Sequence, residues 1–558
     1  MTTGWALDLG TTNTGVACWD DVQGKPRLIE LPAVCRKVDA KDPLEAPRLV
    51  PSAVHFLEDL GALDRLGSWP PLARRFFIGR RALIGRPALE RNEGVAHPSF
   101  VPTFKPGLSG EALRPLARVG RESLTARDAA HAFLRELLRE IKRETGERVR
   151  DLVVTAPVSA FESYRAEVQA GLQKLGVRRV RFLDEPVAAA LGYGISLAHP
   201  RTILVVDIGG GTLHVVLLRL SPQGAVSGQA EVLAKRGRLL GGNAVDGWVL
   251  ADLCRQMGHD LSTDGDELTR LWRRLMLAEA CRVKEAVFFE EEAAFLLTEV
   301  SPRGAPRPAG GVATLSRARL EEILHEQGFF RSLAAALEEV LEQGGVTADD
   351  IEDVLLVGGS TLLPGVFSWF EERFERRRVR AWQPFEAVAY GAACFAGDRM
   401  DALDFIAHDY AFVTHDPKSG EAQHTIIVPR GTRFPTSPEL WKRQLVPTCA
   451  LGEPETLFKL LICEVSRADG GGERRFIWDA SGDVHKVGGT SGEAQVVVPL
   501  NAASPTLGYL DPPHAPRDRR PRLEIAFGVS DERWLIATVR DLLTQRDLLR
   551  EEPVVRLV

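Results

Sequence analysis

The chain has 558 residues, of which 44% are hydrophobic and 26% are charged, and its formal net charge at pH 7 is -6. These values are typical of a globular protein of roughly two to four domains, and they predict no basic surface for nucleic acid. We find no apolar run of the ~18 residues that span a membrane, no signal peptide and no CxxC pair among the seven cysteines. We therefore expect a monomeric cytoplasmic protein with reduced thiols, and no nucleic-acid or membrane partner.

Three short apolar runs along the chain each lead into a turn rich in glycine and hydroxyl side chains. The turns are Asp8-Leu9-Gly10-Thr11-Thr12, Asp207-Ile208-Gly209-Gly210-Gly211-Thr212 and Gly358-Gly359-Ser360-Thr361. The first two share the pattern Asp-apolar-Gly-x-x-Thr and lie about 200 residues apart. A repeat of this length indicates a duplicated α/β half-domain.

Strand and helix patterns alternate between these turns. A helix is predicted over residues 125–145, because its apolar residues recur on one face, Thr125 and Asp128 can form a capping box, and Gly146 can end it. Residues 152–154 and 180–183 read as strands, with a helix over 159–175 between them. This alternation predicts an α/β sheet.

The pattern changes after residue 397. Helical periodicity largely disappears, and residues 522–529 place Leu, Ile, Phe and Val at every second position, which predicts a half-buried strand. Further strands are predicted at 425–428, 495–498 and 534–539, whereas the glycine-rich stretch 470–492 is predicted to be a loop. We expect a nucleotide-binding domain over 1–397, a linker over 398–408 and a β-sandwich over 409–558.

The glycine-rich turns predict a phosphate site. Glycine lets backbone N–H groups approach phosphate oxygens without a Cβ clash, and successive N–H groups form an anion-binding nest. Each aspartate can hold magnesium through the waters of the ion, which keeps a partly hydrated octahedron. The sequence contains neither GxxxxGK[ST] nor GxGxxG, which counts against P-loop and Rossmann sites.

Several segments, in the same order, resemble the signatures of the DnaK-type heat-shock chaperone family, which is the heat shock protein 70 family of the actin-like ATPase superfamily. They include DLGTTNTGVACW, DEPVAAALGYG, VVDIGGGTLHVVLL, LLGGNAVDGWV and VLLVGGSTLLPG. The resemblance covers about residues 3–397. It implies an α/β protein with a two-lobed actin-like ATPase domain, which is a duplicated ribonuclease H-like fold, followed by a β-sandwich.

The resemblance also implies ATP or ADP and magnesium as ligands. Asp8 and Asp207 would hold the waters of the magnesium ion, and Glu185 would complete the catalytic set by positioning the attacking water. The implied nucleotide-binding residues are Gly10, Thr11, Thr12, Asn13, Gly209, Gly210, Gly211, Thr212, Gly241, Gly242, Lys284, Gly358, Gly359 and Ser360.

Two positions depart from the family pattern. Leu89 stands where the family has a lysine that reaches the phosphates, and an alternative alignment of residues 79–83 also places a leucine, Leu83, there. His214 stands where the family has an aspartate. The loss of two such charged groups would cost roughly two to four orders of magnitude in hydrolysis, if each acts as a positioned acid or base. We therefore expect hydrolysis to be slow or absent. In the implied base pocket, Phe288 could either stack on a base or pack in the interior.

The C-terminal part resembles the peptide-binding β-domain of the same family through HTIIVPRGTRFPT and LEIAFGVSDERWLIATV. This implies binding of extended or unfolded polypeptide segments in a groove, with a co-chaperone as a possible further partner. The sequence stops at residue 558, soon after the last predicted strand, so we expect no helical lid and rapid exchange of any bound peptide.

Three functions remain open from the sequence. The first is an ATP-binding, chaperone-like protein with weak hydrolysis that binds polypeptide segments under nucleotide control. The second is a nucleotide-gated regulator or scaffold that does not hydrolyse ATP and docks one dedicated partner, an alternative that Leu89 and His214 favour. The third is a small-molecule kinase of the same superfamily, against which DEPVAAALGYG and the β-rich C-terminal part both count.

Overall fold

The computed structural model describes residues 4–36, 48–58, 81–92, 97–109, 115–157, 162–195, 199–228, 230–258, 267–296, 312–398, 406, 408–415, 421–449, 453–466, 475–479, 481–487, 496–502, 504–530 and 533–557. Most of the predicted linker, 398–408, lies outside the described residues. Within the described ranges, no helix has both the length and the apolar character that crossing a lipid bilayer requires.

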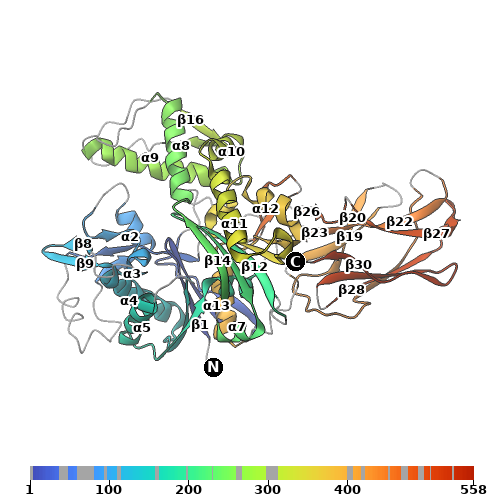
Figure 1. The fold of residues 1–558 in the computed structure, drawn as a ribbon, viewed down its shortest axis with the longest axis horizontal. Coiled ribbons are helices and arrows are strands. Elements are labelled where there is room, and N and C mark those ends of the chain that lie inside the picture. Colours follow the sequence, from blue (N-terminus) through green and yellow to red (C-terminus); the bar gives the residue numbers. More distant parts are fainter. Residues whose placement is uncertain are drawn as a thin grey trace. The chain divides into compact units, whose positions relative to one another are not determined.

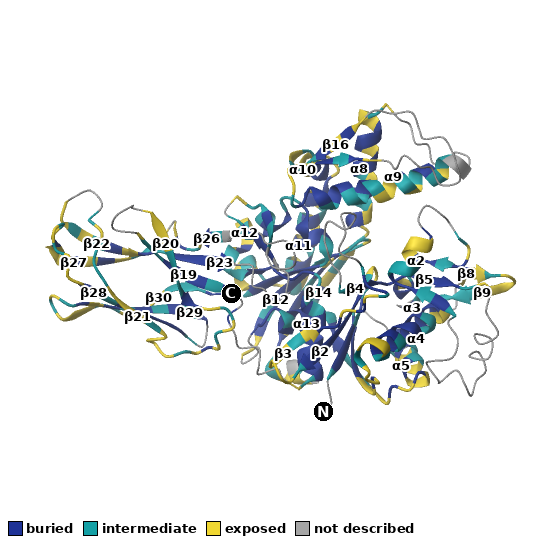
Figure 2. Ribbon diagram, turned by 180° about the vertical axis from the view of Figure 1, so that it is seen from behind, coloured by how far each residue is buried: buried dark blue, intermediate teal, exposed yellow. Residues whose placement is uncertain are grey.

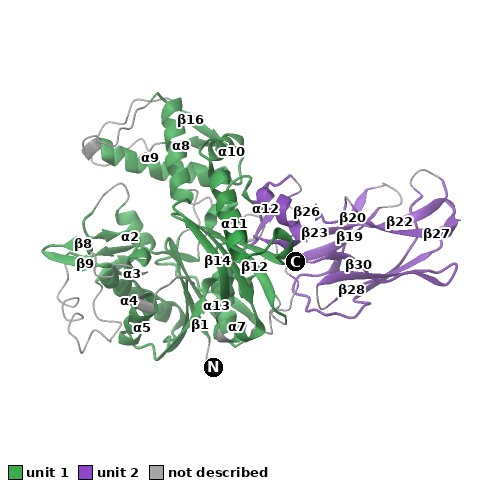
Figure 3. Ribbon diagram, in the orientation of Figure 1, with its two compact units in different colours: residues 1–366, 383–402 green, residues 367–382, 403–558 purple. Residues whose placement is uncertain are grey.

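The chain forms two compact units (Figure 3). Unit 1 contains residues 1–366 and 383–402, and unit 2 contains residues 367–382 and 403–558. The sequence patterns predict a single boundary near residues 398–408, and they do not indicate that the segment 367–382 groups with the C-terminal part.

Unit 1 is a mixed α/β structure that contains two sheets built on the same plan (Figure 1). In each sheet, three consecutive antiparallel strands are followed by a strand that runs parallel to the first of them. The first sheet has the order β11-β10-β1-β2-β3, with β4 beside β2, and the second contains β14-β13-β12-β17. This repetition agrees with the duplicated half-domain that the sequence predicts.

The strands of these two sheets have the following bounds. They are β1 (Trp5–Leu9), β2 (Asn13–Asp20), β3 (Lys25–Leu28), β4 (Leu49–Pro51), β10 (Asp151–Ala156), β11 (Arg179–Asp184), β12 (Arg201–Ile208), β13 (Leu213–Leu220), β14 (Glu231–Arg238) and β17 (Asp353–Val357). The smaller sheets of unit 1 contain β5 (Val54–Phe56), β6 (Ala82–Ile84), β7 (Phe100–Val101), β8 (Pro115–Val119), β9 (Glu122–Thr125), β15 (Glu292–Phe295) and β16 (Ala313–Ser316).

The helices of unit 1 connect these strands. They are α2 (Arg86–Arg91), α3 (Lys105–Ser109), α4 (Ala126–Thr145), α5 (Glu162–Lys174), α6 (Glu185–Gly192), α7 (Pro222–Ser227), α8 (Gly242–Gln256), α9 (Glu267–Ala286), α10 (Arg317–Glu326), α11 (Phe329–Gly344) and α13 (Ala387–Ala396), with short 3-10 turns η2 (Ala348–Asp350) and η3 (Gly359–Leu362).

Helix α4 begins and ends where the sequence predicts. The backbone N–H of Thr125 donates to Asp128 at 2.9 Å, and that of Asp128 donates back to the Thr125 hydroxyl at 3.3 Å, which completes the capping box. Gly146 ends the helix in the left-handed conformation, with φ of 75°.

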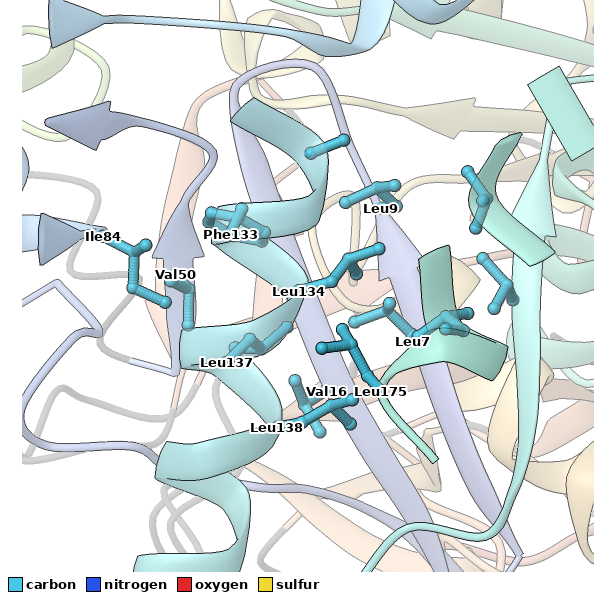
Figure 4. Packing of buried hydrophobic residues seen from close by; sticks show 14 of the residues in the cluster. Leu7, Leu9, Val16, Val50, Ile84, Phe133, Leu134, Leu137, Leu138 and Leu175 are labelled. Carbon is cyan, nitrogen blue, oxygen red and sulfur yellow. The ribbon is translucent and has the colours of Figure 1, made fainter. Parts of the chain in front are cut away.

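The core of the first sheet lies between its strands and helix α4 (Figure 4). The side chains that meet there are all buried, and they include Leu7, Leu9, Val16, Val50, Ile84, Phe133, Leu134, Leu137, Leu138 and Leu175. Because successive side chains of a strand point to opposite faces, Asp8 lies on the face of β1 away from this core. A Cβ added at Gly15 would lie 3.1 Å from Ala389 of α13 and 3.7 Å from Asp8, so α13 covers this second face.

Helices α6 and α13 cross with their backbones almost in contact. A Cβ added at Gly391 would lie 1.8 Å from the carbonyl oxygen of Ala188, and one added at Gly192 would lie 1.8 Å from that of Ala387. Only glycine fits at both positions. The crossing holds α6 in place, and α6 begins at Glu185.

Unit 2 contains two four-stranded antiparallel sheets that contribute to one core, as in a β-sandwich. Their orders are β20-β19-β23-β26 and β21-β28-β29-β30. Leu523, Ile525, Phe527 and Val529 of β28 are all buried in this core, which confirms the strand and the face predicted from their alternation. Figure 2 shows that strands such as β1 and β12 of unit 1 are largely buried, whereas strands such as β27 and β30 of unit 2 also carry many exposed residues.

The elements of unit 2 have the following bounds. They are α12 (Val366–Phe374), which begins one residue before the unit, η4 (Arg376–Arg378), β18 (Val379–Arg380), β19 (Asp409–His415), β20 (Ala422–Val428), β21 (Trp441–Leu445), β22 (Glu455–Leu460), β23 (Ile462–Ser466), β24 (Arg475–Trp478), β25 (Val484–Val487), β26 (Val496–Pro499), β27 (Thr506–His514), β28 (Leu523–Val529), β29 (Trp534–Asp541) and β30 (Arg546–Arg556).

The prediction of a loop over 470–492 is wrong, because β24 and β25 pair as an antiparallel hairpin within it. Phe476, Ile477 and Trp478 are buried, and the Trp478 ring stacks on Phe367 with centroids 4.5 Å apart. Because glycines surround this short apolar run, the sequence pattern does not reveal it as a strand. Its packing partner, Phe367, lies more than 100 residues earlier in unit 2.

Replacing Gly391 with alanine should destabilise the protein by about 1–3 kcal/mol or more, because the added methyl overlaps the Ala188 carbonyl. Gly247→Ala on α8 is the matched control, since a Cβ there meets nothing within 4 Å and alanine favours a helix by up to about 1 kcal/mol. Denaturant unfolding measures both. Equal stability of the two variants would contradict the close crossing of α6 and α13.

Candidate functional site

The first glycine-rich turn connects β1 to β2. A Cβ at Gly10 would lie 2.1 Å from the carbonyl oxygen of Asn13, so the turn requires glycine there. Ser52 supports the turn, because its hydroxyl donates to the Gly10 carbonyl at 2.8 Å and its backbone N–H to the Thr12 carbonyl at 2.8 Å. Thr11 and Thr12 remain exposed. Asn13, which was predicted to bind nucleotide, accepts a hydrogen bond from Arg36 at 3.1 Å.

The second turn connects β12 to β13 and is closed by a hydrogen bond from the Gly209 N–H to the Thr212 carbonyl at 3.0 Å. The start of α8 lies on this turn: the backbone N–H of Gly242 donates to the Gly209 carbonyl at 3.0 Å. A Cβ at Gly241 would lie 2.6 Å from the same carbonyl oxygen, so the contact requires glycine.

The third turn follows β17 and lies against the second. Gly358 has φ of 89°, and a Cβ there would lie 2.7 Å from a carboxylate oxygen of Asp207. The Ser360 hydroxyl donates to the Gly209 carbonyl at 3.0 Å. Phe385, the residue before the EAVAYG segment, packs against Gly359.

The first and second turns meet at Thr12 and Gly210. A Cβ at Gly210 would lie 3.1 Å from the Thr12 hydroxyl oxygen, so the side chain of one turn lies directly over the backbone of the other. At Gly211 a Cβ would meet nothing within 4 Å, and at Gly209 only the Thr212 carbonyl at 3.8 Å. The second turn therefore presents open backbone beside two exposed threonines, which suits an anion.

Three carboxylates gather at these turns. The Thr155 hydroxyl donates to Asp8 at 2.7 Å. Burial, followed by the charge of Glu185, raises the pKa of Asp8 to about 6, although Lys105 and Thr155 oppose the shift. Burial and the charge of Glu185 likewise raise the pKa of Asp207 to about 7. The mutual effect of their charges indicates that Asp8, Glu185 and Asp207 share one site.

The arrangement fits a hydrated cation. Within the described part of the chain, no three His, Cys, Asp or Glu side chains lie close enough to ligate one metal directly. Two carboxylates such as Asp8 and Asp207 suit an ion that keeps most of its own waters, as magnesium does. A positive ion beside them would also offset the charge of Glu185, which adds to burial in raising both pKa values.

A lysine that no sequence motif indicated lies in this site. The Lys105 amine, on α3, is 2.7 Å from a carboxylate oxygen of Glu185, and its side chain is only 10% exposed. Burial works against its charge, but the Glu185 carboxylate and the other acidic neighbours raise the pKa of Lys105 above its usual value. Leu89, where the family has its lysine, is 38% exposed on α2. The departure at Leu89 stays a prediction, and the structure adds that another lysine, Lys105, lies beside Glu185.

His214 stands directly opposite Asp207 in the β12–β13 pairing. Partial burial of the imidazole lowers the pKa of His214, so the ring is neutral at pH 7. A neutral imidazole is a weak partner for hydrated magnesium, and the departure from the family pattern at His214 stays a prediction.

Lys284 pairs with Asp246 of α8 at 2.7 Å, and both side chains are buried. A Cβ at Gly242 would lie 3.3 Å from the Lys284 amine and 2.8 Å from the Ser360 hydroxyl, so these three predicted residues lie together. Phe288 is 2% exposed and packs edge-on against Phe289, which favours the interior-packing interpretation over stacking on a base.

Asp207→Asn should raise the melting temperature of the protein without divalent cations, and more so at pH 8 than at pH 5. The pKa of Asp207 in the folded chain, about 7, exceeds the ordinary value of 3.8. The ionised carboxylate therefore costs stability, and this cost grows from about pH 4 and is complete above about pH 7.

Asp21→Asn, at an exposed turn position, is the matched control. Its effect on the melting temperature should be small and equal at both pH values. A pH-independent effect of Asp207→Asn would contradict the raised pKa.

Comparison with known proteins agrees with the sequence motifs. A family model described as Hsp70 protein matches residues 78–410. The chain is 28% identical to "Chaperone protein DnaK" of Thermus thermophilus over 441 residues, which cover 77% of this chain and 66% of the relative. It is 30% identical to "Chaperone protein dnaK3" of Thermosynechococcus vestitus, over 77% of this chain and 60% of the relative.

A third relative is "Stromal 70 kDa heat shock-related protein, chloroplastic" of Pisum sativum, which is 28% identical over 85% of this chain and 62% of its own length. The matches thus span about two thirds or less of the length of these three relatives.

Proposed function

This chain belongs to the Hsp70 protein family, and on that premise we propose that it is an ATP-binding, chaperone-like protein with an actin-like, two-lobed nucleotide-binding domain. The observation that carries the proposal is the meeting of two Asp-x-Gly turns, with Thr12 over Gly210, beside Asp8, Asp207 and Glu185. Open backbone N–H groups suit phosphate, and the carboxylates suit its hydrated counter-ion.

The residues divide between the two ligands. Asp8 and Asp207 would hold magnesium through its waters, and the ion would neutralise phosphate charge. Gly209, Gly210 and Gly211 would contact phosphate oxygens through backbone N–H groups. Lys284, with Gly242 and Ser360, would flank the nucleoside.

We further propose weak hydrolysis, coupled to the binding of extended polypeptide segments by unit 2. Glu185 would orient the attacking water, and Lys105 supplies a positive charge to the site although Leu89 carries none. The neutral His214 opposite Asp207 works against rapid turnover. A monomeric state, a cytoplasmic location and a co-chaperone remain predictions.

A second candidate is a nucleotide-gated regulator that binds ATP without hydrolysing it, and His214 is the observation that favours it. The Hsp70 family match argues against the small-molecule kinase alternative. Single-turnover measurements with excess protein separate the first two candidates: turnover above buffer supports the chaperone-like protein, and none supports the regulator.

Gly211→Ala should weaken ATP binding at least about tenfold, or ~1.4 kcal/mol, while the protein folds normally. A methyl group there meets nothing within 4 Å of the protein, but it projects into the space that the phosphates would occupy. Titration calorimetry with magnesium and ATP measures the affinity, with Gly247→Ala as the control. Unchanged affinity would contradict the placement of phosphate on the second turn.

Unfolded, apolar peptides should bind the full chain, and ATP should change their affinity. Fluorescence anisotropy of a labelled extended peptide, with and without magnesium and ATP, tests this coupling. Gly211→Ala should bind the peptide but need at least about tenfold more ATP for the same response. Peptide affinity that ATP leaves unchanged would favour the regulator with a dedicated partner.

A further inference from the structure

Two buried donors lie on α3 and α5, two helices of the first half of unit 1 that contact each other. One is the Lys105 ammonium on α3, and the other is the hydroxyl of Tyr164 on α5. Tyr164 is 0% exposed, and its hydroxyl has no hydrogen-bond partner among the described residues. An unpartnered buried hydroxyl costs stability, so a position of this kind indicates that something else bonds to it.

Lys105 also has unused bonding capacity. An ammonium group carries three N–H donors, and within the described ranges Lys105 makes one hydrogen bond, to Glu185 at 2.7 Å. Its position is tied to the first glycine-rich turn, because the hydroxyl of Thr103, two residues earlier, donates to the Thr11 carbonyl at 2.9 Å. The remaining donors of Lys105 thus belong to a segment that is bonded directly to the candidate phosphate site.

The contact between α3 and α5 brings the two donors near each other, and the charges that act on them agree with this. Burial raises the pKa of Tyr164 to about 12, and the charges that act on its hydroxyl are those of Lys105, Glu185 and Asp8. Lys105 in turn lowers the pKa values of Asp8 and Asp207. The charge of Lys105 therefore partly offsets those of Asp8, Glu185 and Asp207. The hydroxyl of Tyr164 keeps its proton.

An anionic oxygen is the hydrogen-bond partner that suits both the Lys105 ammonium and the Tyr164 hydroxyl. A cation at this position would be repelled by Lys105, whereas an anionic oxygen accepts hydrogen bonds from an ammonium and from a phenol alike. Lys284 is already paired with Asp246 at 2.7 Å, beside Gly242, whereas Lys105 is paired with Glu185.

Resting on the proposed function, we propose that Lys105 and Tyr164 recognise the terminal phosphate of a nucleoside triphosphate. Lys105 binds it through charge, held in position by Glu185, and Tyr164 binds it through a hydrogen bond donated by its hydroxyl. A diphosphate lacks the group that both donors contact. The pair therefore discriminates between the triphosphate and the diphosphate.

The test is the ratio of ATP to ADP affinity, measured by calorimetry on the full chain with magnesium. K105M should weaken ATP binding about tenfold or more and change ADP binding by less than about threefold. Lys174→Met, at an exposed position on α5, is the matched control and should leave both affinities unchanged.

Y164F removes only the hydroxyl. It should weaken ATP binding about threefold to tenfold, spare ADP, and leave the melting temperature without nucleotide equal or higher, since the lost group has no partner among the described residues. A merely structural tyrosine would instead lower the melting temperature without changing the ATP to ADP ratio. If K105M does not fold, Y164F decides the question alone.

Failure of the proposed function and failure of the assignment of Lys105 and Tyr164 give different results. If the unmodified chain binds neither ATP nor ADP, the proposed function itself is wrong. If it binds both, and the ratio is the same in Y164F and K105M as in the unmodified chain, the assignment of Lys105 and Tyr164 is wrong while the proposed function stands.

Discussion

The ion pair between Lys105 and Glu185 is the interaction on which the site depends. Asp8, Glu185 and Asp207 repel one another, and burial strengthens that repulsion because little water screens it. One ammonium beside Glu185 offsets part of this cost. The remaining excess of negative charge favours a cation and opposes an anion by itself, which is consistent with the proposed binding of a polyphosphate together with its magnesium ion.

The fold holds these charges in place through close backbone contacts, and glycine makes these contacts possible. Gly192 and Gly391 let α6 and α13 cross at a distance that no side chain allows, which fixes the start of α6 and therefore Glu185. Gly210 lets the second turn approach Thr12, and Gly241 lets α8 rest on the second turn. Stability and ligand geometry thus have a common physical origin in this domain.

The division of the chain bears on how nucleotide and polypeptide binding could be coupled. Segment 367–382 belongs to unit 2, although it follows the third turn by only a few residues and precedes α13 in the chain. The backbone therefore passes between the units at three points, near residues 366, 382 and 402. Within unit 2, the β24–β25 hairpin binds this segment through the stacking of Trp478 on Phe367. Only a few residues of backbone therefore separate the third turn from unit 2, so a conformational change at this turn acts close to the β-rich unit.

The local features of this protein follow from its sequence, because they depend on residues that are neighbours along the chain. The glycine-rich turns, the capped helix α4 and the alternating strand β28 are of this kind, and sequence patterns are therefore sufficient to locate Asp8, Asp207 and the three turns. Lys105 could not be assigned in this way, because it reaches Glu185 from another element, 80 residues earlier in the chain. No local pattern encodes such proximity. Which lysine enters the site, the interior packing of Phe288 and the hairpin over residues 475–487 all depend on long-range packing, and so they are features of the tertiary structure.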